Sequence, residues 1–426
     1  MVDINYAGEG SVAHAVAALC LETGHDAAAY HGRLIEVEGY IHAKLSPSNA
    51  HRWMACPGSH ALEQKNQHQV DFYSGVVDDE MVEHVQCYLD AVRARIDARR
   101  LAGAVEVVLF VEKKVGIAHI TGEADATGTV DAALVSIFAD GSALLDVIDL
   151  KYGKGVRVDP AENPQLCLYA CGVLAEMELI YDIQNVMLTI HQPRITVEPS
   201  DWQTSADVLR EFAVIASDAA KMALVAHEFI DNWSDTTNNA YLCPGEKQCR
   251  FCEAKAFCPA LAEFVKENVG NDFEVLADPV YKPAPPQYLG ADVLAIKMNA
   301  VGVVEQWCRA VCAEVERRLL DGKPIDGWKL VQGRQGARQW IDINIAEEAM
   351  KAMRLKISEM YDMKPISPTN AEKLLKSSPR RWAKLQDLIT RADGKPSIAP
   401  ASDKRPAIDP KAVVLEDFDV VEGGEP

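Results

Sequence analysis

The order of helical and β-rich segments in the middle of the chain restricts the possible folds more than any other feature of the sequence. The pattern is helix, three strands, helix, strand, over residues 78–101, 105–111, 130–138, 143–150, 164–178 and 185–191. Asp140-Gly141, between the second and third strands, is typical of a hairpin turn. This alternation predicts an α/β or α+β core, in which helices cover a sheet.

Further helical patterns and one proline-rich segment predict how the 426 residues divide into domains. The helical patterns cover residues 10–24, 46–53, 203–231, 291–321, 345–355, 368–376 and 379–392. Four prolines between residues 279 and 286 favour a stiff, extended linker. We therefore expect a first domain over 1–270, a linker over 271–290, a helical domain over 291–395 and a mobile acidic tail over 396–426.

The charge balance excludes a protein coated with basic side chains for binding nucleic acid. Lys and Arg number 43 against 63 Asp and Glu, which gives a formal charge of −20, and such a surface would repel phosphate groups. Contact with DNA would therefore need a local basic groove or bound cations. No stretch reaches the roughly 18 apolar residues of a spanning helix, and the N-terminus lacks the pattern of a secretory signal. We expect a cytoplasmic protein with no membrane partner.

Two strand carboxylates and a lysine form the first candidate site. Asp131 follows Gly128-Thr129-Val130, and Asp149 lies on a later strand, two residues before Lys151, so that Asp149 and Lys151 face the same way. Adjacent strands can bring Asp131 beside Asp149, where two carboxylates repel each other unless a divalent cation lies between them. Oxygen ligands of this kind suit Mg²⁺ or Mn²⁺. Alone, an Asp-x-Lys triplet is more typical of a surface strand end.

A motif on the next helix gives these residues a context. Gln165 and Tyr169 are four residues apart and hence on one helix face, and Pro164 suits the first turn. The order Asp, Asp-x-Lys, Gln-x-x-x-Tyr, and above all the stretch Val147–Gly155, resembles the RecB-like branch of the PD-(D/E)XK nuclease superfamily, and more closely a phage- and prophage-associated family in that branch. The resemblance implies a restriction-endonuclease-like core, a central mixed sheet flanked by helices, with Gln165 and Tyr169 near the metal and the DNA.

The resemblance also implies a role for each residue of the first candidate site. Asp131 and Asp149 would bind the metal, with the Leu150 carbonyl as a further ligand. Lys151 would assist the hydrolysis of a phosphodiester. Asp125 is an alternative to Asp131, but the Gly-Thr that precedes Asp131 and the apolar strand that follows it favour Asp131.

The same family carries a Gly-Thr/Ser-x-x-His helix that brings a histidine to the metal. The segment from Gly10 to His14 matches this motif, so the resemblance implies His14 as a metal ligand. A single histidine on an apolar helix is otherwise more often a packed core residue. In the family the histidine helix follows the segment that corresponds to Cys56, whereas here it precedes that segment. The two blocks are exchanged, with joints near residues 41 and 67–72.

Four cysteines within sixteen residues form the second candidate site: Cys243, Cys249, Cys252 and Cys258. In a reducing compartment, so many cysteines in a short segment indicate a metal site. The site could hold zinc or an iron–sulfur cluster. The C-x2-C-x5-C triplet, together with the distant Cys56 in Arg-Trp-x-x-Cys-Pro, resembles iron–sulfur nucleases of the AddB type. That likeness implies a [4Fe–4S] cluster on Cys56, Cys249, Cys252 and Cys258, which would tie the start of the nuclease domain to its end. The alternative is Zn²⁺ at Cys243, Cys249, Cys252 and Cys258.

Together these features predict a metal-dependent DNA nuclease, an exonuclease of phage recombination or DNA processing that uses Mg²⁺ or Mn²⁺. The expected partners are DNA and phage recombination proteins, such as a single-strand binding or annealing protein or a helicase. Two basic groups are candidates for phosphate contact: Lys151, Lys154 and Arg157, and Lys373, Lys376, Arg380, Arg381, Trp382 and Lys384. The alternative is a catalytically inactive DNA-binding or scaffold protein that retains the fold and the metal cluster.

Overall fold

The computed structural model describes residues 6–37, 43–64, 73–229, 239–269, 290–329, 348, 351–352, 368–376 and 379–386. The chain forms two compact units, Met1–Val331 and Gln332–Pro426. The first unit holds the sheet and both candidate sites, so its architecture decides where the site residues lie.

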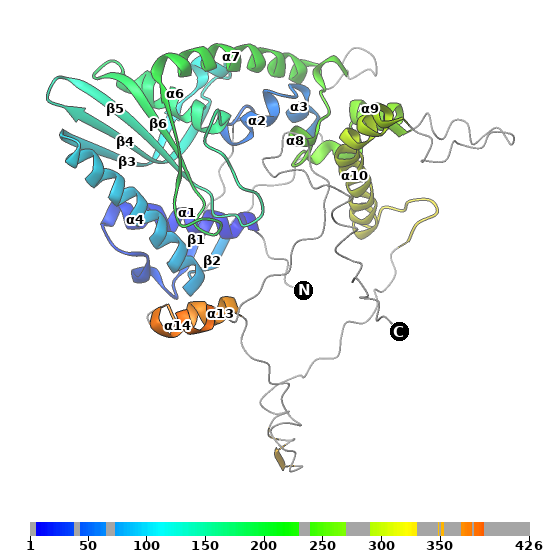
Figure 1. Cartoon of the computed structure of the whole chain (residues 1–426). Helices are drawn as coiled ribbons and strands as arrows, with labels where there is room; N and C mark the ends of the chain where they lie inside the picture. Colours follow the sequence, from blue (N-terminus) through cyan, green and yellow to red (C-terminus); the bar gives the residue numbers. More distant parts are fainter. Residues whose placement is uncertain are drawn as a thin grey trace, which may run out of the picture. The chain divides into compact units, whose positions relative to one another are not determined.

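A five-stranded mixed sheet forms the centre of the first unit (Figure 1). Its strands, in spatial order, are β3 (Ala104–Gly116), β4 (Thr127–Phe138), β5 (Ser142–Leu150), β6 (Asp182–His191) and β7 (Ser200–Ser205). All neighbours are antiparallel except β5 and β6. Parallel strands need a crossover connection, and the helix α6 (Pro164–Met177) lies in it. The predicted α/β core, a mixed sheet flanked by helices, is confirmed.

The turn between β4 and β5 forms as the sequence predicts. Gly141 has a φ of 87°, which glycine adopts without strain. The Asp140 carboxylate accepts the backbone N–H of Ser142 at 3.0 Å. This tight turn fixes the register of β4 against β5, and so decides which residues lie opposite one another at the far end of the hairpin, where Asp131 and Asp149 are found.

Two pairs of helices cover the two faces of the sheet (Figure 1). The helices α1 (Tyr6–Thr23) and α4 (Asp79–Leu101) lie on one face, and α6 and α7 (Ala206–Glu228) lie on the other. The α1–α4 side of the core includes Val12, Val16, Cys20, Val85, Leu89, Ala132, Leu134, Ile148 and Leu150. The α6–α7 side includes Val135, Leu145, Val147, Leu166, Val173, Leu188, Leu209 and Ala216. Because both faces are buried, the central strands are almost continuously apolar.

A group of buried ion pairs fastens α4 to the sheet. Asp146 on β5 is fully buried and accepts hydrogen bonds from Arg99 at 2.6 Å and from Arg95 at 2.9 Å. Arg95 also donates to Asp201, at the start of β7, at 2.7 Å. Loss of one partner would leave a buried charge uncompensated. Asp146 therefore has a structural role, although it lies only three residues before Asp149.

Short elements complete the first unit: η1 (Ala27–Tyr30), β1 (Leu34–Val37), η2 (Pro47–Asn49), α2 (Ala50–Trp53), α3 (Gly58–Gln64), β2 (Tyr73–Val76), α5 (Ala118–Thr121), η4 (Asn239–Tyr241), α8 (Glu246–Cys249), η5 (Glu253–Ala256) and α9 (Pro259–Val269). The helix α10 (Ala291–Leu320) packs on α8, η5 and α9. Its Val303 and Trp307 contact the core around Cys249. Because of this packing α10 belongs to the first unit, and the two units divide after Val331 rather than at the predicted linker over 271–290.

The start of the helix predicted over 203–231 is wrong. Residues Ser200–Ser205 form β7 instead, because they pair with the edge of β6 that no other strand covers. The side chain of Ser205 then caps α7 by accepting the backbone N–H of Val208 at 3.3 Å. Local helical pattern is thus overridden by antiparallel pairing with the preceding strand.

The second unit is described only in part. The helices α13 (Pro368–Leu374) and α14 (Pro379–Gln386) lie within the segments predicted as helical over 368–376 and 379–392. Most of the helix predicted over 345–355, nearly all of the linker predicted over 271–290 and the whole tail over 396–426 lie outside the described residues. Among the helices that are described, none is long and apolar enough to cross a membrane.

Candidate functional site

The first candidate site lies in a fork where β4 and β5 separate. Their pairing runs from the hairpin turn to Ala132 opposite Ile148 and stops there. Just beyond, the Asp131 carboxylate accepts the backbone N–H of Leu150 at 2.7 Å. A side-chain oxygen therefore takes the place of a strand carbonyl, and the second oxygen of Asp131 is left to face α1. Asp131 and Asp149 both lie at this fork.

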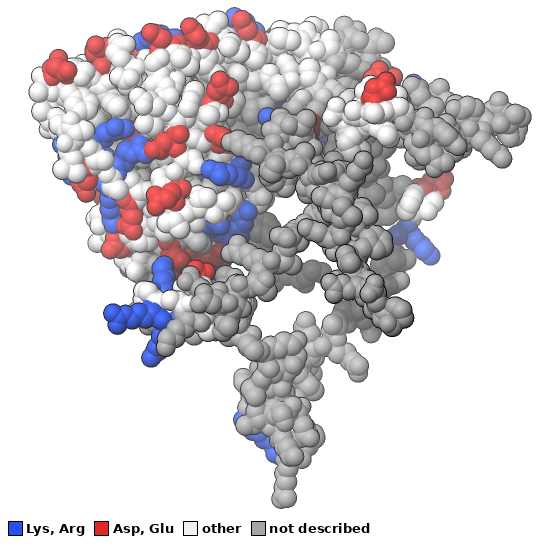
Figure 2. Space-filling model, viewed as in Figure 1, with Lys and Arg blue, Asp and Glu red and all other residues white. Residues whose placement is uncertain are grey.

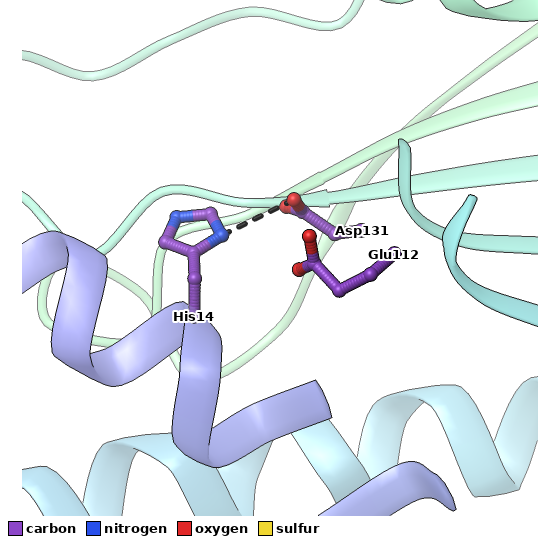
Figure 3. A group of neighbouring side chains, drawn as sticks. All are labelled: His14, Glu112 and Asp131. Carbon is purple, nitrogen blue, oxygen red and sulfur yellow. Dashed lines mark hydrogen bonds and ion pairs between the residues drawn. The ribbon is translucent and has the colours of Figure 1, made fainter. Parts of the chain in front are cut away.

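The histidine of α1 approaches the same carboxylate. His14 Nδ1 lies 3.1 Å from the other carboxylate oxygen of Asp131 (Figure 3). Val12, Ala13, Val16 and Ala17 hold α1 against the sheet and so fix the position of the imidazole. Burial lowers the pKa of His14, but the charge and the hydrogen bond of Asp131, together with the Asp149 charge, outweigh burial and raise the pKa to about 9. Burial likewise opposes ionisation of Asp131, yet His14 and Lys151 lower its pKa.

A glutamate that the sequence reasoning missed completes this group. Val111 pairs with Ala132 and Lys113 with Val130, so Glu112 lies opposite Asp131 on the neighbouring strand. One ligand atom each of His14, Glu112 and Asp131 lies within 4.8 Å of the others, and Figure 3 shows the three side chains converging. Partial burial and the Asp131 charge raise the pKa of Glu112 to about 7. In the sequence, Glu112-Lys113-Lys114 looks like a solvated strand face, and only the register of β3 against β4 reveals the contact.

The second carboxylate is held on the α6 side of the fork. Asp149 is buried, and Lys151 Nζ lies 2.8 Å from its Oδ2. That oxygen makes no aligned hydrogen bond. Burial, reinforced by the Asp131 charge, raises the pKa of Asp149 in spite of Lys151. The Lys151 ammonium group therefore compensates the charge of this buried carboxylate.

The helix α6 supplies the residues that orient the lysine. Lys151 donates to Gln165 Oε1 at 2.9 Å, and Gln165 Nε2 donates to the Tyr169 hydroxyl at 3.0 Å. The same Nε2 lies 3.4 Å from Asp149 Oδ1. The Asn163 side chain caps α6 and Pro164 begins it, which points this face at the fork. The residues of the Asp-x-Lys and Gln-x-x-x-Tyr motifs are therefore in mutual contact.

Gly128 of the Gly-Thr-Val-Asp motif allows a close approach to this group. A Cβ atom at Gly128 would lie 2.7 Å from Pro47 Cγ and 2.8 Å from Tyr169 Cε1. By contrast, Asp125 lies in the preceding turn with an exposed side chain and a φ of 59°. The structure thus brings Asp131, and not Asp125, to His14.

Replacing Gly128 with alanine is expected to lower the free energy of unfolding by about 1–3 kcal/mol, since the added methyl group must displace a proline and an aromatic ring. Gly116→Ala is the matched control, because a Cβ there meets nothing within 4 Å, and its effect should stay within about 0.5 kcal/mol. Urea unfolding of the three proteins measures both changes. Equal stability of the two variants would contradict the close approach.

The second candidate site gathers four of the five predicted cysteines. Cys56, Cys249, Cys252 and Cys258 line one small cavity, together with Leu62, Leu242 and Leu261. Burial raises the pKa of all four thiols. Cys243 is exposed and does not line the cavity. Its backbone N–H instead donates to Cys56 Sγ at 3.2 Å, and the N–H of Gly245 donates to Cys249 Sγ at 3.4 Å. Such donors stabilise negative charge on sulfur.

A buried ion pair holds the two cysteine segments together. Arg52 Nη2 lies 2.8 Å from Glu63 Oε2, and both side chains are buried. Arg52 also donates to the carbonyl of Phe251 at 3.0 Å, and Glu63 accepts the backbone N–H of Glu253 at 2.7 Å. The Arg-Trp-x-x-Cys-Pro segment is therefore bound to the C-x2-C-x5-C segment by hydrogen bonds as well as by apolar packing.

Comparison with models of known protein families assigns the chain to one of them. A family model described as "Protein of unknown function (DUF2800)" matches residues 42–75 and 66–406, which is most of the sequence. The chain belongs to this DUF2800 family. The matched residues include Asp131, Asp149 and Lys151 and the cysteines of the second site, whereas His14 lies before them.

A solved structure described as "Crystal structure of SSO0001" is also similar to this DUF2800 chain. The two are 13% identical, and the match covers 59% of this chain and 98% of the other. The TM-score is 0.22, too low to support an argument about fold.

On the face drawn in Figure 2, the basic side chains of the described residues do not form one continuous surface. In Figure 2, Lys and Arg are interspersed with Asp and Glu over the described part of the first unit. Lys154 pairs with Glu80 at 2.6 Å, and Arg157 donates to Ser200 at 3.4 Å. The second predicted group lies on α13, on α14 and in the turn after α13. Its exposed side chains are those of Lys373, Lys376, Arg380 and Arg381. Trp382 is half-buried, and the side chain of Lys384 lies outside the described part.

Proposed function

We propose that the protein is a metal-dependent DNA nuclease of the RecB-like, PD-(D/E)XK type, acting as an exonuclease in phage recombination or DNA processing. The main support is the fork between β4 and β5. It brings Asp131 and Asp149 to one place, with the Lys151 ammonium group 2.8 Å from Asp149. Two acids and a lysine so arranged suit the hydrolysis of a phosphodiester, because the substrate and the developing transition state are both anionic.

The donor set fits a hard divalent ion such as Mg²⁺ or Mn²⁺. Asp131, Asp149, the Leu150 carbonyl and His14 would hold it, since carboxylate and carbonyl oxygens are the ligands that a hard divalent ion prefers. When bound, such an ion supplies charge neutralisation at the phosphate and a more acidic water. The ion would also supply positive charge at the site itself, where the formal charge of −20 on the chain otherwise opposes the approach of DNA.

In this proposal Lys151 holds a positive charge at a fixed position beside the phosphate of the bond that is cut. Its ammonium group is held by Asp149 and by Gln165, and Gln165 is held in turn by Tyr169. A fixed positive charge stabilises the negative charge that develops on the phosphate oxygens. Gln165 and Tyr169 are positioning residues in this proposal.

The cysteine cavity fits a [4Fe–4S] cluster on Cys56, Cys249, Cys252 and Cys258 better than Zn²⁺. A tetrahedral zinc ion with bonds of about 2.3 Å needs its sulfurs about 3.8 Å apart. Over the described ranges, no three Cys ligand atoms come within 4.8 Å of one another. A four-iron cluster places each thiolate on a different iron and so suits wider spacing. The zinc alternative also needs Cys243, whose side chain is exposed.

The test is digestion of end-labelled linear DNA by the full chain with Mg²⁺ or Mn²⁺, with and without a chelator. We expect the DNA to be shortened only when the metal is present. This nuclease activity should co-elute with the protein through successive columns. Binding of DNA in a mobility-shift assay without cleavage under either metal would overturn the proposal, and would favour the inactive DNA-binding or scaffold protein.

A further inference from the structure

The exposed side of α7 carries a row of large apolar side chains. They recur every seven residues, which is close to two helical turns, so they lie along one side of the helix. They are Val208, Ile215, Met222 and, directly after the last residue of α7, Phe229. The exposed fraction of the four ranges from 44% at Val208 to 64% at Ile215. We call this row the α7 stripe, and α7 runs along the upper edge of the first unit in Figure 1.

The packing of α7 on the rest of the first unit does not account for the stripe. The helix packs on α3, α5, α6 and the sheet, and its buried side chains are mostly alanines: Ala206, Leu209, Ala216, Ala220, Ala223 and Ala226. Among the described residues of this core, none belongs to the stripe. A helix that only covers a sheet turns its large apolar side chains inward, whereas Ile215 and Met222 are left in water. A continuous row of this kind is typical of an interaction surface.

The charged side chains of α7 are mainly acidic. Four are acidic and two are basic: Asp207, Glu211, Asp218 and Glu228, with Arg210 and Lys221. Glu211 lies four residues before Ile215 and Asp218 three residues after it, so both border the stripe. The two bases are already bound to Asp207 at 2.6 Å and to Asp218 at 2.8 Å. Within the described ranges Glu211 has no basic partner, so the stripe is bordered by an excess of negative charge.

This charge distinguishes a second copy of the chain from a partner of another kind. If two α7 helices packed along their stripes in antiparallel order, Asp218 of each copy would lie beside Asp218 of the other, and like charges repel at that distance. The two bases of α7 lie about 100° round the helix from the stripe, so a second copy brings no base to the seam. A helix with basic side chains beside its apolar row would instead pair with Glu211 and Asp218.

We propose that the α7 stripe is the docking site of an amphipathic helix from another protein, which carries apolar side chains every seven residues and Lys or Arg beside them. The apolar side chains of that helix would cover the stripe, and its bases would pair with Glu211 and Asp218. Exclusion of water by the apolar contact would strengthen these ion pairs. The docking site does not depend on the proposed nuclease activity, because its residues lie outside both the fork and the cysteine cavity.

The test uses a synthetic probe, a fluorescently labelled peptide of four heptads with Leu along one side and Lys at the positions that border it. Its binding to the full chain is measured by fluorescence anisotropy at physiological ionic strength, where general attraction to an acidic protein is largely screened. We expect saturable binding of one peptide per chain. A peptide of the same composition in scrambled order has the same charge but no continuous apolar side, and it should bind at least about tenfold more weakly.

Ile215→Gln and Met222→Gln should each weaken binding of the ordered peptide by about tenfold, because each removes apolar surface that the peptide would bury. Leu101→Gln is the matched control, since Leu101 is 89% exposed at the end of α4, on the opposite face of the sheet, and its replacement should leave binding unchanged. Because all three side chains are exposed, thermal unfolding of the variants should match that of wild type. Glu211→Lys should weaken binding of the Lys peptide several-fold and strengthen binding of a peptide with Glu in place of Lys.

Equal affinity of the ordered and scrambled peptides, or of wild type and the two stripe variants, would overturn the inference, since binding would then reflect only the net charge of the chain. Self-association of the wild-type chain in analytical ultracentrifugation, lost in Ile215→Gln, would overturn it in favour of a second copy. A chain that binds the ordered peptide through the stripe but never cuts DNA would support this inference while refuting the nuclease.

Discussion

Replacing Asp149 with alanine should reduce metal-dependent cleavage of linear DNA by at least about 10³-fold in kcat/KM, equivalent to about 4 kcal/mol of transition-state stabilisation. Two consequences of the change act together. The metal loses a carboxylate ligand at the fork, and Lys151 loses the ion pair that fixes its ammonium group. The initial rate of release of the end label, measured at several Mn²⁺ concentrations, gives the size of the effect.

Asp97→Ala is the appropriate control for this experiment. The Asp97 side chain is exposed on α4, 3.6 Å from Arg100, so its removal tests the loss of one surface charge without touching the fork. Its cleavage rate should equal that of wild type. Residual cleavage that is the same in wild type and in Asp149→Ala would mean that a contaminating nuclease produces the signal, and the assignment of Asp149 would be wrong.

Changing Cys56 to serine should remove the metal cluster and destabilise the first unit. The serine oxygen is a poor substitute for a thiolate on iron, so protein purified without oxygen should lose its brown colour and its iron. The cluster would join two segments separated by nearly two hundred residues of chain, and we expect a loss of about 2–5 kcal/mol of stability, as for a disulfide of similar span. Iron and acid-labile sulfide analysis, visible absorbance and thermal unfolding measure these changes.

Cys243→Ser separates the two metal hypotheses. Cys243 is exposed and contributes only its backbone N–H to Cys56, and serine keeps that N–H, so the variant should remain brown and stable. A colourless wild-type protein with one bound zinc, and a loss of that zinc in Cys243→Ser, would contradict the iron–sulfur assignment.

The sequence was sufficient to predict those strands, turns and helices whose hydrophobic pattern is regular and local. The strand-rich stretch from 104 to 150, its Asp140-Gly141 turn and the long helices, apart from the start of α7, appear where their periodicity places them. The approach of Gln165 to Lys151 also follows from helical spacing once α6 is placed. These features depend on contacts between residues that are near in sequence, or on a turn that fixes the register of its own two strands.

The features that the sequence did not reveal depend on how the strands pair in the folded sheet. β7 forms because Ser200–Ser205 pair with the edge of the preceding strand β6. Glu112 reaches the site because β3 pairs with β4 in one register and bends at one residue. The packing of α10 on the cysteine segment likewise joins parts of the chain on either side of the predicted linker.

The placement of Trp53 and of Val12 on opposite faces of the sheet has a consequence for how relatives of this chain are found. The segment with Arg52 and Cys56 docks on the α6 side, and α1 docks on the α4 side, each through its own contacts. Neither needs the other as its predecessor, so their order can be permuted while the geometry of the fork stays intact. Collinear alignment rewards only matching order, so it would split such a protein into pieces. Comparison of spatial arrangement, free of sequence order, is the more sensitive way to recognise its kin.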